Sequence, residues 1–226
     1  MIQFDDLADQ SAKIKVVGVG GAGGNALNGM IEAGLSGVEF ISVNTDAQNL
    51  ENNRAPHRIQ IGKNHTKGLG AGANPEIGLK AIEEDKEAII NSLTGADMVF
   101  ITAGMGGGTG TGAAPVIARA AKEMGILTVA IVTIPFRFEG PERINQAIDG
   151  INELKDHVDS LLVINNEKLR EIYGNLRVSN AFEKADDVLA IAAKGIAEII
   201  TVHGYINVDF ADVQTVMYNS GVAIMG

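Results

Sequence analysis

Short apolar runs and amphipathic segments alternate along most of the chain. The apolar runs have the length and composition of buried strands: Ile14–Val19, Val38–Val43, Arg58–Ile61, Asp97–Thr102, Leu127–Ile134 and Asp159–Ile164. The segments between and after them predict helices at Asn25–Ala33, Pro75–Leu93, from Ala113 onward, after Arg143 to about His157, and from about Val178 to Val202. This alternation predicts an α/β fold with a doubly wound, mostly parallel, Rossmann-like sheet.

The long helix expected from about Val178 divides the chain into parts. Residues 13–177 hold the predicted sheet, and residues 178–226 hold the long helix, a loop and a last helix that we expect to reach about Ala223. Residues 1–12 are acidic and show no periodicity, so we expect a mobile N-terminal tail.

Three glycine-rich turns follow predicted strands and precede predicted helices. They are Gly18-x-Gly20-x-x-Gly23, the segment with Gly68, Gly70 and Gly72, and the run Gly104–Gly112. Glycine lets backbone N–H groups converge, and the positive end of the following helix favours an anion. Such turns gather at the carboxyl ends of a doubly wound sheet, so three of them favour a nucleoside triphosphate.

The run Gly104–Gly112 contains no lysine and is therefore not the common P-loop. Amides, the hydroxyls of Thr109 and Thr111, the helix end and a metal ion would have to balance the charge of a phosphate. The first turn alone fits the dinucleotide fingerprint, although Asp46 lies beyond the usual position of the ribose-binding acid and Glu39 falls in mid-strand. An NAD-dependent Rossmann oxidoreductase therefore stays open as an alternative.

Two pairs of side chains at helical spacing are candidates for the rest of the ligand. Glu139 and Arg143 are four residues apart, which suits a surface ion pair or a contact to ribose or phosphate. Phe182 and Asp186 share a helix face, where a ring can stack on a purine and a carboxylate can accept the two donors of guanine. The alternative for this pair is a core ring beside a solvated carboxylate.

Asp209 and Asp212 stand three residues apart at the start of the last predicted helix. Helix capping and the helix dipole explain both positions from the sequence alone.

Composition excludes several classes of protein. The net charge of −10 argues against nucleic acid as a partner, and no apolar run is long enough to span a membrane. There is no cysteine, the four histidines lack metal-ligand spacing, and acids stand where a signal peptide has bases. We expect a soluble, cytoplasmic protein that inserts into no membrane.

Six stretches together resemble the FtsZ family, the bacterial tubulin-like GTPases of cell division. They are Gly20-Gly-Ala-Gly-Gly-Asn25, Asn44-Thr-Asp46, Gly70-Ala-Gly72, Gly106-Gly-Gly-Thr-Gly-Thr-Gly112, Phe138-Glu-Gly140 and Asn207-Val-Asp-Phe-Ala-Asp212. The fourth stretch is the tubulin-type signature, and the resemblance runs from about Ile14 to the end. It implies the tubulin/FtsZ GTPase fold, GTP or GDP with magnesium carried by the nucleotide, and head-to-tail assembly at the division site.

The resemblance also assigns residues. It implies nucleotide contacts at Gly20, Gly21, Gly23, Gly24, Asn25, Asn44, Gly70, Ala71, Gly72, Gly104, Gly106, Gly107, Gly108, Thr109, Gly110, Thr111, Glu139, Arg143, Asn166, Phe182 and Asp186. Among these, Asn166, Phe182 and Asp186 would hold the guanine. Asn207, Asp209 and Asp212 would be catalytic in the site of the next copy, where the two carboxylates help to polarise the attacking water. No side chain is assigned to a metal.

The chain departs from the family pattern at three places. Asn165 stands where proline is usual, and the stretch Gly174–Asn180 is shorter than in many members. The family continues into a second domain and a tail that binds division partners, and we expect this chain to lack both. We therefore expect a truncated chain that binds nucleotide but assembles and hydrolyses GTP poorly, with a non-catalytic, GDP-binding cap of filament ends as a further alternative.

Overall fold

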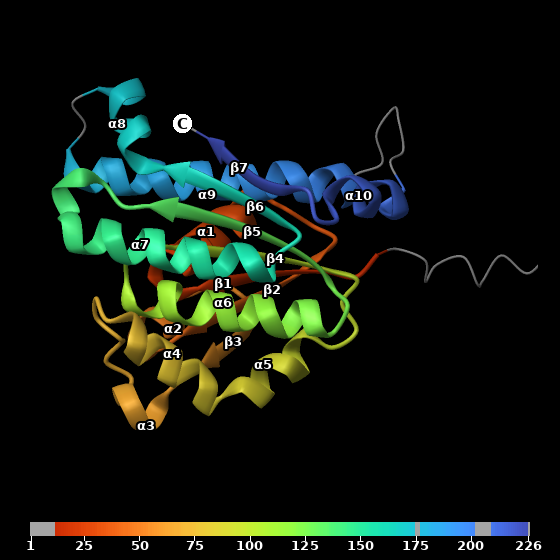
Figure 1. Ribbon diagram of the computed structural model, residues 1–226, viewed down its shortest axis with the longest axis horizontal. Coiled ribbons are helices and arrows are strands. Elements are labelled where there is room, and N and C mark those ends of the chain that lie inside the picture. The colour runs from red at the N-terminus through yellow and green to blue at the C-terminus, as the bar shows by residue number, and fades with distance from the viewer. Residues whose placement is uncertain (1–11, 175–176, 202–208, 226) are drawn as a thin grey trace, which may run out of the picture.

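The computed structural model describes residues 12–174, 177–201 and 209–225. Within these ranges one seven-stranded sheet has the order β3-β2-β1-β4-β5-β6-β7, and all neighbouring strands are parallel. The strands are β1 (Ile14–Val19), β2 (Val38–Asn44), β3 (His57–Gln60), β4 (Met98–Gly104), β5 (Leu127–Ile134), β6 (Ser160–Asn165) and β7 (Gly221–Met225). The predicted doubly wound sheet is confirmed (Figure 1).

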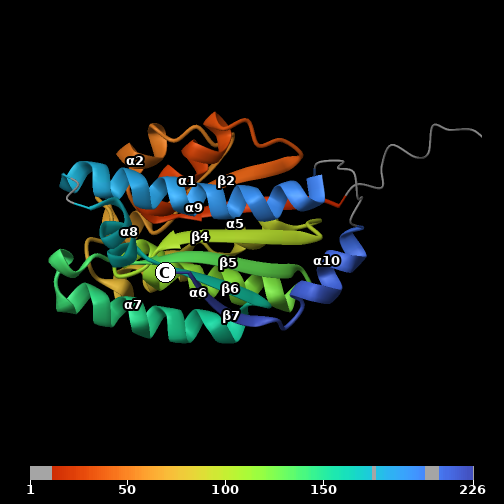
Figure 2. The same ribbon diagram turned by 90° about the horizontal axis from the view of Figure 1, so that it is seen from above.

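Helices cover both faces of the sheet, as Figures 1 and 2 show. One face packs against α4 (Pro75–Glu84), α5 (Lys86–Leu93), α6 (Gly108–Glu123) and α7 (Pro141–Leu154), and the other against α1 (Gly20–Glu32) and α9 (Val178–Thr201). Alternate strand residues enter the two cores: Val17 and Ile101 face the first, and Val16 and Phe100 the second. This double burial explains the continuous apolar runs.

Shorter elements connect these layers. They are α2 (Ala47–Glu51), α3 (Lys63–Thr66), α8 (Asn166–Tyr173), α10 (Phe210–Met217) and the 3₁₀ turns η2 (Arg137–Glu139) and η3 (Lys155–His157). Asp46 is the N-cap of α2, where its carboxylate accepts a hydrogen bond from the Asn49 backbone N–H at 3.0 Å.

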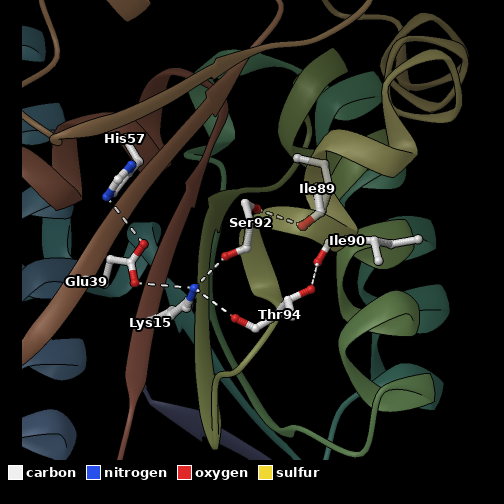
Figure 3. Close-up of polar contacts among 7 residues, drawn as sticks. All are labelled: Lys15, Glu39, His57, Ile89, Ile90, Ser92 and Thr94. Atoms are coloured by element: carbon white, nitrogen blue, oxygen red, sulfur yellow. Dashed lines mark hydrogen bonds and ion pairs between the residues drawn. The ribbon is translucent and has the colours of Figure 1, made fainter.

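A buried lysine links strands β1 and β2 to the end of α5 at the amino edge of the sheet. The ammonium of Lys15 donates to the carbonyls of Ser92 (2.7 Å) and Thr94 (3.3 Å) at the end of α5 and pairs with Glu39 (3.3 Å), as Figure 3 shows. Glu39 in turn lies 3.4 Å from Nε2 of His57 on β3. Because the three donors of Lys15 have three acceptors, its burial leaves no donor unpaired. This edge is held together by side chains.

Two predicted helices differ from the observed elements. The last helix ends at Met217, not near Ala223, and residues 221–225 form β7, paired in register with β6 from Ser160 onward. The helix stops at the extended C-cap residue Tyr218, Asn219 follows with φ of +50°, and the edge of β6 offers backbone partners that the local sequence does not reveal. The predicted helix over 75–93 is interrupted at Asp85, whose carboxylate accepts from the Gly62 N–H at 2.7 Å.

Candidate functional site

A cleft of about 410 Å³ opens at the carboxyl ends of β1, β2, β4 and β5. The three predicted glycine turns meet there, because parallel strands end on the same edge of the sheet. The cleft walls also include the start of α6, the turn before α7, and one face of α9. Segments far apart in the sequence therefore form a single concave surface.

The first glycine turn brings α1 close to the sheet. α1 begins at Gly20, directly after β1, and a side chain at Gly23 would meet the carbonyl oxygen of Thr102 on β4. Gly20 and Gly21 line the cleft, whereas Gly23 and Gly24 are buried against the strands and the Asn53 side chain. The first pair is thus placed for a ligand, and the second pair for helix–sheet packing.

The run Gly104–Gly112 forms a turn that ends in the first turn of α6. Gly106 has φ of +92°, and its N–H donates to the Thr111 hydroxyl at 2.8 Å, which fixes the turn from inside. Gly107 is the N-cap of α6, and the Gly108 N–H donates to the Gly72 carbonyl at 2.8 Å. The second and third glycine segments are thereby joined, and the positive end of α6 faces the cleft.

Glu139 and Arg143 form an ion pair on the cleft wall. The Arg143 guanidinium donates to Glu139 at 2.9 Å, and the other Glu139 oxygen accepts from the Phe136 N–H at 3.0 Å. The predicted ion pair is therefore present, and both residues line the cleft. Side-chain oxygens and N–H donors held in this way suit the hydroxyls of a sugar.

An aromatic ring and polar side chains form the other end of the cleft. The Phe182 ring packs edge-on against Phe136 and Phe138, with centroids 5.5 and 5.9 Å away. Asn166 is 5% exposed, and its Oδ1 has no hydrogen-bond partner among the described residues. A buried acceptor of this kind normally finds a donor, and Asn166 lines the cleft, where a ligand could supply one.

Asp186 is half-buried on α9 and accepts a hydrogen bond from the Asn25 side-chain amide at 2.9 Å. Burial and, to a smaller degree, the neighbouring Asp187 carboxylate raise the pKa of Asp186, the Asn25 hydrogen bond opposes them, and the resulting pKa is about 6. The Asp186 carboxylate therefore lacks strong partners of its own and is available to N–H donors. Asn25 contacts the base-side residue Asp186 rather than lining the cleft itself.

Most of the predicted site residues are brought together. Those that line the cleft are Gly20, Gly21, Asn44, Gly70, Ala71, Gly72, Gly104, Gly107, Gly108, Thr109, Gly110, Glu139, Arg143, Asn166, Phe182 and Asp186. Gly23, Gly24, Gly106 and Thr111 are buried outside the cleft lining, and Asn25 is exposed beside Asp186. Their assignment as nucleotide contacts stays a prediction.

Sequence reasoning missed several lining residues. Thr45 and Asn49 follow β2, and Thr133 and Pro135 lie at the end of β5. The available signal was their position, because residues just after parallel strands face the same edge as the glycine turns.

The predicted catalytic aspartates lie far from this cleft. Asp209 and Asp212 are exposed at the start of α10, which leads into the amino end of β7, opposite the carboxyl edge (Figures 1 and 2). Asp209 occupies the N-cap position, yet its side chain makes no capping hydrogen bond, so capping does not account for it. Asn207 lies outside the described residues.

The described part of the chain shows neither a cluster of metal-binding side chains nor a membrane-spanning helix. No group of three or more His, Cys, Asp or Glu side chains is placed there to hold a metal ion. Among the described helices, none combines the length and apolarity needed to cross a membrane.

The fold and the cleft define an α/β protein of the class that receives phosphate-bearing ligands at the carboxyl edge of a parallel sheet. Residues 13–174 match the family model of the tubulin/FtsZ family, GTPase domain, and the chain belongs to that family. The family predicted from the sequence is thus confirmed, and the alternative of an NAD-dependent oxidoreductase finds no support.

Two curated relatives carry the name cell division protein FtsZ. The protein of Azotobacter vinelandii is 59% identical over 227 residues, and that of Pseudomonas aeruginosa is 60% identical over 227 residues. Each alignment covers 100% of this chain and 58% of the relative. The chain therefore spans a little over half the length of these curated relatives.

Two solved structures are similar to this chain over most of its length. The FtsZ dimer of M. jannaschii, described as empty, has a TM-score of 0.94 and 51% identity, with 96% of this chain and 63% of that chain covered. CetZ2 of Haloferax volcanii, described as a GTPgS-bound protofilament, has a TM-score of 0.80 at 24% identity over 94% of this chain and 64% of that one. The second likeness concerns the fold alone.

Proposed function

We propose that this chain binds GTP and GDP in the cleft and hydrolyses GTP between head-to-tail copies during cell division. The observation that carries the proposal is the composition of the cleft. Three glycine-rich turns and the start of α6 form one end, and Asn166, Phe182 and Asp186 form the other. One end suits phosphates and the other suits a purine.

At the phosphate end, backbone amides of the turns at Gly20–Gly21 and Gly107–Gly110 would donate to phosphate oxygens. Preorganised amides and the α6 helix end stabilise negative charge without rearranging, which is the main requirement of phosphoryl transfer. Magnesium binds chiefly through phosphate oxygens and water with one or two carboxylates, and Asp46 is the carboxylate on this wall. When bound, the ion would supply further charge neutralisation.

At the base end, Asp186 would accept from the N1–H and the amino group of guanine. Adenine presents no such donor pair, so the carboxylate would select guanine. The unpartnered Asn166 Oδ1 is a second acceptor at this end. Phe182 would stack on the base, supported by Phe136 and Phe138.

Hydrolysis would need a second copy. Asp209 and Asp212 lie at the amino end of the sheet and cannot reach the cleft of their own chain. Head-to-tail stacking would set them against the cleft of the next copy, where they would orient the attacking water. The printed description of the M. jannaschii FtsZ structure as a dimer supports self-association. Division partners would join such a polymer.

The first test is the nucleotide carried by the purified protein. We expect denaturation to release GDP or GTP, identified by chromatography against standards. Release of NAD, or the absence of any guanine-nucleotide binding by calorimetry, would contradict the proposed ligand.

The second test is the GTP hydrolysis rate per molecule as a function of protein concentration. We expect this rate to rise with concentration and to fall at least about tenfold in Asp212→Ala, because the water-orienting carboxylate is lost. The control is Asp149→Ala, an exposed carboxylate on α7, which should hydrolyse GTP as the parent does. Nucleotide binding without turnover at any concentration would favour the GDP-binding cap.

A further inference from the structure

Two threonine hydroxyls meet at the bottom of the cleft. Oγ1 of Thr45 lies 2.6 Å from Oγ1 of Thr109, although the residues are 64 positions apart. Thr45 follows β2 and is 0% exposed, and Thr109 is in the first turn of α6 and is 9% exposed. Both residues line the cleft. The distance is at the short end for hydroxyl pairs, so the contact is well formed.

The direction of this hydrogen bond depends on what Thr109 does. Each hydroxyl carries one proton, and neither makes another hydrogen bond among the described residues. If Thr109 donates to Thr45, it has no proton left for an anion in the cleft. If Thr45 donates to Thr109, the Thr109 proton is free to point at a phosphate oxygen. The second arrangement forms a directed pair in which each hydrogen bond strengthens the other.

The backbone of Thr45 is held so that its side chain keeps this position. The single proton of the Thr66 hydroxyl is shared between the Gly62 carbonyl (3.0 Å) and the Thr45 carbonyl (3.3 Å). The next residue, Asp46, donates its N–H to Asn44 Oδ1 (3.2 Å) and caps α2 through its carboxylate. These contacts fix the backbone next to Thr45, and because Thr45 is 0% exposed, its side chain has little room to turn away from Thr109.

We propose that Thr45 is a positioning residue for phosphate, which acts by donating to Thr109 and so directing the Thr109 proton into the cleft. This inference rests on the proposed binding of guanine nucleotide in the same cleft. It assigns to the residue that follows β2 a part in phosphate binding that runs through a side chain on α6. Thr45 itself need not touch the ligand.

The test is a double-mutant cycle on GDP affinity, with Thr45→Val, Thr109→Val and the double variant, measured by isothermal titration calorimetry. Valine keeps the shape of threonine and removes the donor. One hydrogen bond contributes about 0.5–1.5 kcal/mol, so we expect Thr45→Val to weaken GDP binding about two- to tenfold. In the Thr109→Val background the same change should have no further effect, because its only route to phosphate is gone.

Thr45→Ser should bind GDP like the parent, since it keeps the donor. Thr128→Val is the matched control, as Thr128 is equally buried at the amino end of β5 and its hydroxyl donates to the Ile126 carbonyl, away from the cleft. If Thr45→Val does not fold, Thr45→Ala compared with Thr45→Ser replaces it in the cycle. Equal affinity of the parent and Thr45→Val, or additive effects in the cycle, would overturn the inference. Failure of the parent itself to bind GDP would instead contradict the proposed function.

Discussion

At the scale of single residues, the base end of the cleft is governed by one carboxylate in an unfavourable setting. Asp186 is partly removed from water, has Asp187 as a neighbour and accepts one neutral hydrogen bond from Asn25. These surroundings raise its pKa to about 6. A ligand that brings two N–H donors would replace lost water with hydrogen bonds and so favour the charged form.

The affinity for GDP should therefore depend on the ionisation of Asp186. We expect binding to strengthen as the pH rises through about 6 and to level off above it, because only the ionised carboxylate accepts both donors. Asp186→Asn should weaken GDP binding about ten- to a hundredfold at pH 7.5. Calorimetry over pH 5–8 on parent and variant separates this effect from titration of the phosphate. Parallel pH profiles of the two proteins would contradict it.

Ionisation of Asp186, which we expect to strengthen GDP binding, should lower the stability of the nucleotide-free chain. Its pKa is higher in the folded chain than the ordinary value of 3.8, so between about pH 4 and 6 the folded state binds more protons than the unfolded state. The free energy of unfolding must then fall as the pH rises through this window. Without nucleotide, Asp186→Asn should melt above the parent at pH 7.5 and close to it near pH 4. Thermal melts followed by circular dichroism give this comparison.

At the scale of elements, the phosphate end depends on how closely α4 and α6 approach. A side chain at Gly112 of α6 would meet the carbonyl oxygen of Pro75 and, at 2.6 Å, the backbone nitrogen of Leu79. At Gly78 of α4 it would meet the carbonyl of Gly108. Backbone atoms cannot move aside as the ends of flexible side chains can. The glycines therefore allow a contact that sets the position of the second glycine segment beside the start of α6.

Gly112→Ala should consequently destabilise the fold by about 1–3 kcal/mol, as overpacking of a buried contact does. Gly195→Ala is the matched control, because Gly195 is exposed in the middle of α9 and an added methyl group meets nothing within 4 Å. That change should stabilise the chain by about 0.4–1 kcal/mol. Urea denaturation of the three proteins provides the measurement. A Gly112→Ala chain as stable as Gly195→Ala would show that the two helices can separate freely.

At the scale of the whole molecule, the two functional ends lie on opposite edges of one sheet. The cleft is at the carboxyl edge, while Asp209 and Asp212 are at the amino edge beside the start of β7. The Lys15 network also lies at the amino edge, where it joins β1 and β2 to α5. In the proposed assembly, the cleft face would bind nucleotide and the opposite face would act on the nucleotide of a neighbouring copy.

Two defective variants should therefore restore each other when mixed. Asp212→Ala chains keep an intact cleft, and Asp186→Asn chains keep intact carboxylates at the other end. At a GTP concentration that only the first variant binds, we expect the mixture to hydrolyse GTP faster than the sum of the two separate samples. Activity equal to that sum would mean that the aspartates do not act in a neighbouring copy.

The strand–helix alternation was predictable because parallel strands buried on both faces must be apolar along their length. The glycine turns located the carboxyl edge, and the helical spacing of Phe182 and Asp186 placed both on one face. The break at Asp85 and the strand β7 were not predictable. Their causes are a hydrogen bond to Gly62 and the free edge of β6, which are contacts between distant segments.

By itself, the sequence determined the class of fold, the edge of the sheet that carries the cleft, and most residues that line it. Periodicity and glycine content are local properties of the sequence. Because the carboxyl ends of parallel strands meet at one edge of the sheet, these properties predict where the cleft lies. Only the tertiary structure decided which glycines face the cleft and which pack, that Asn25 contacts Asp186, and that Thr45 meets Thr109. These pairings depend on how distant elements pack together, so no local pattern in the sequence predicts them.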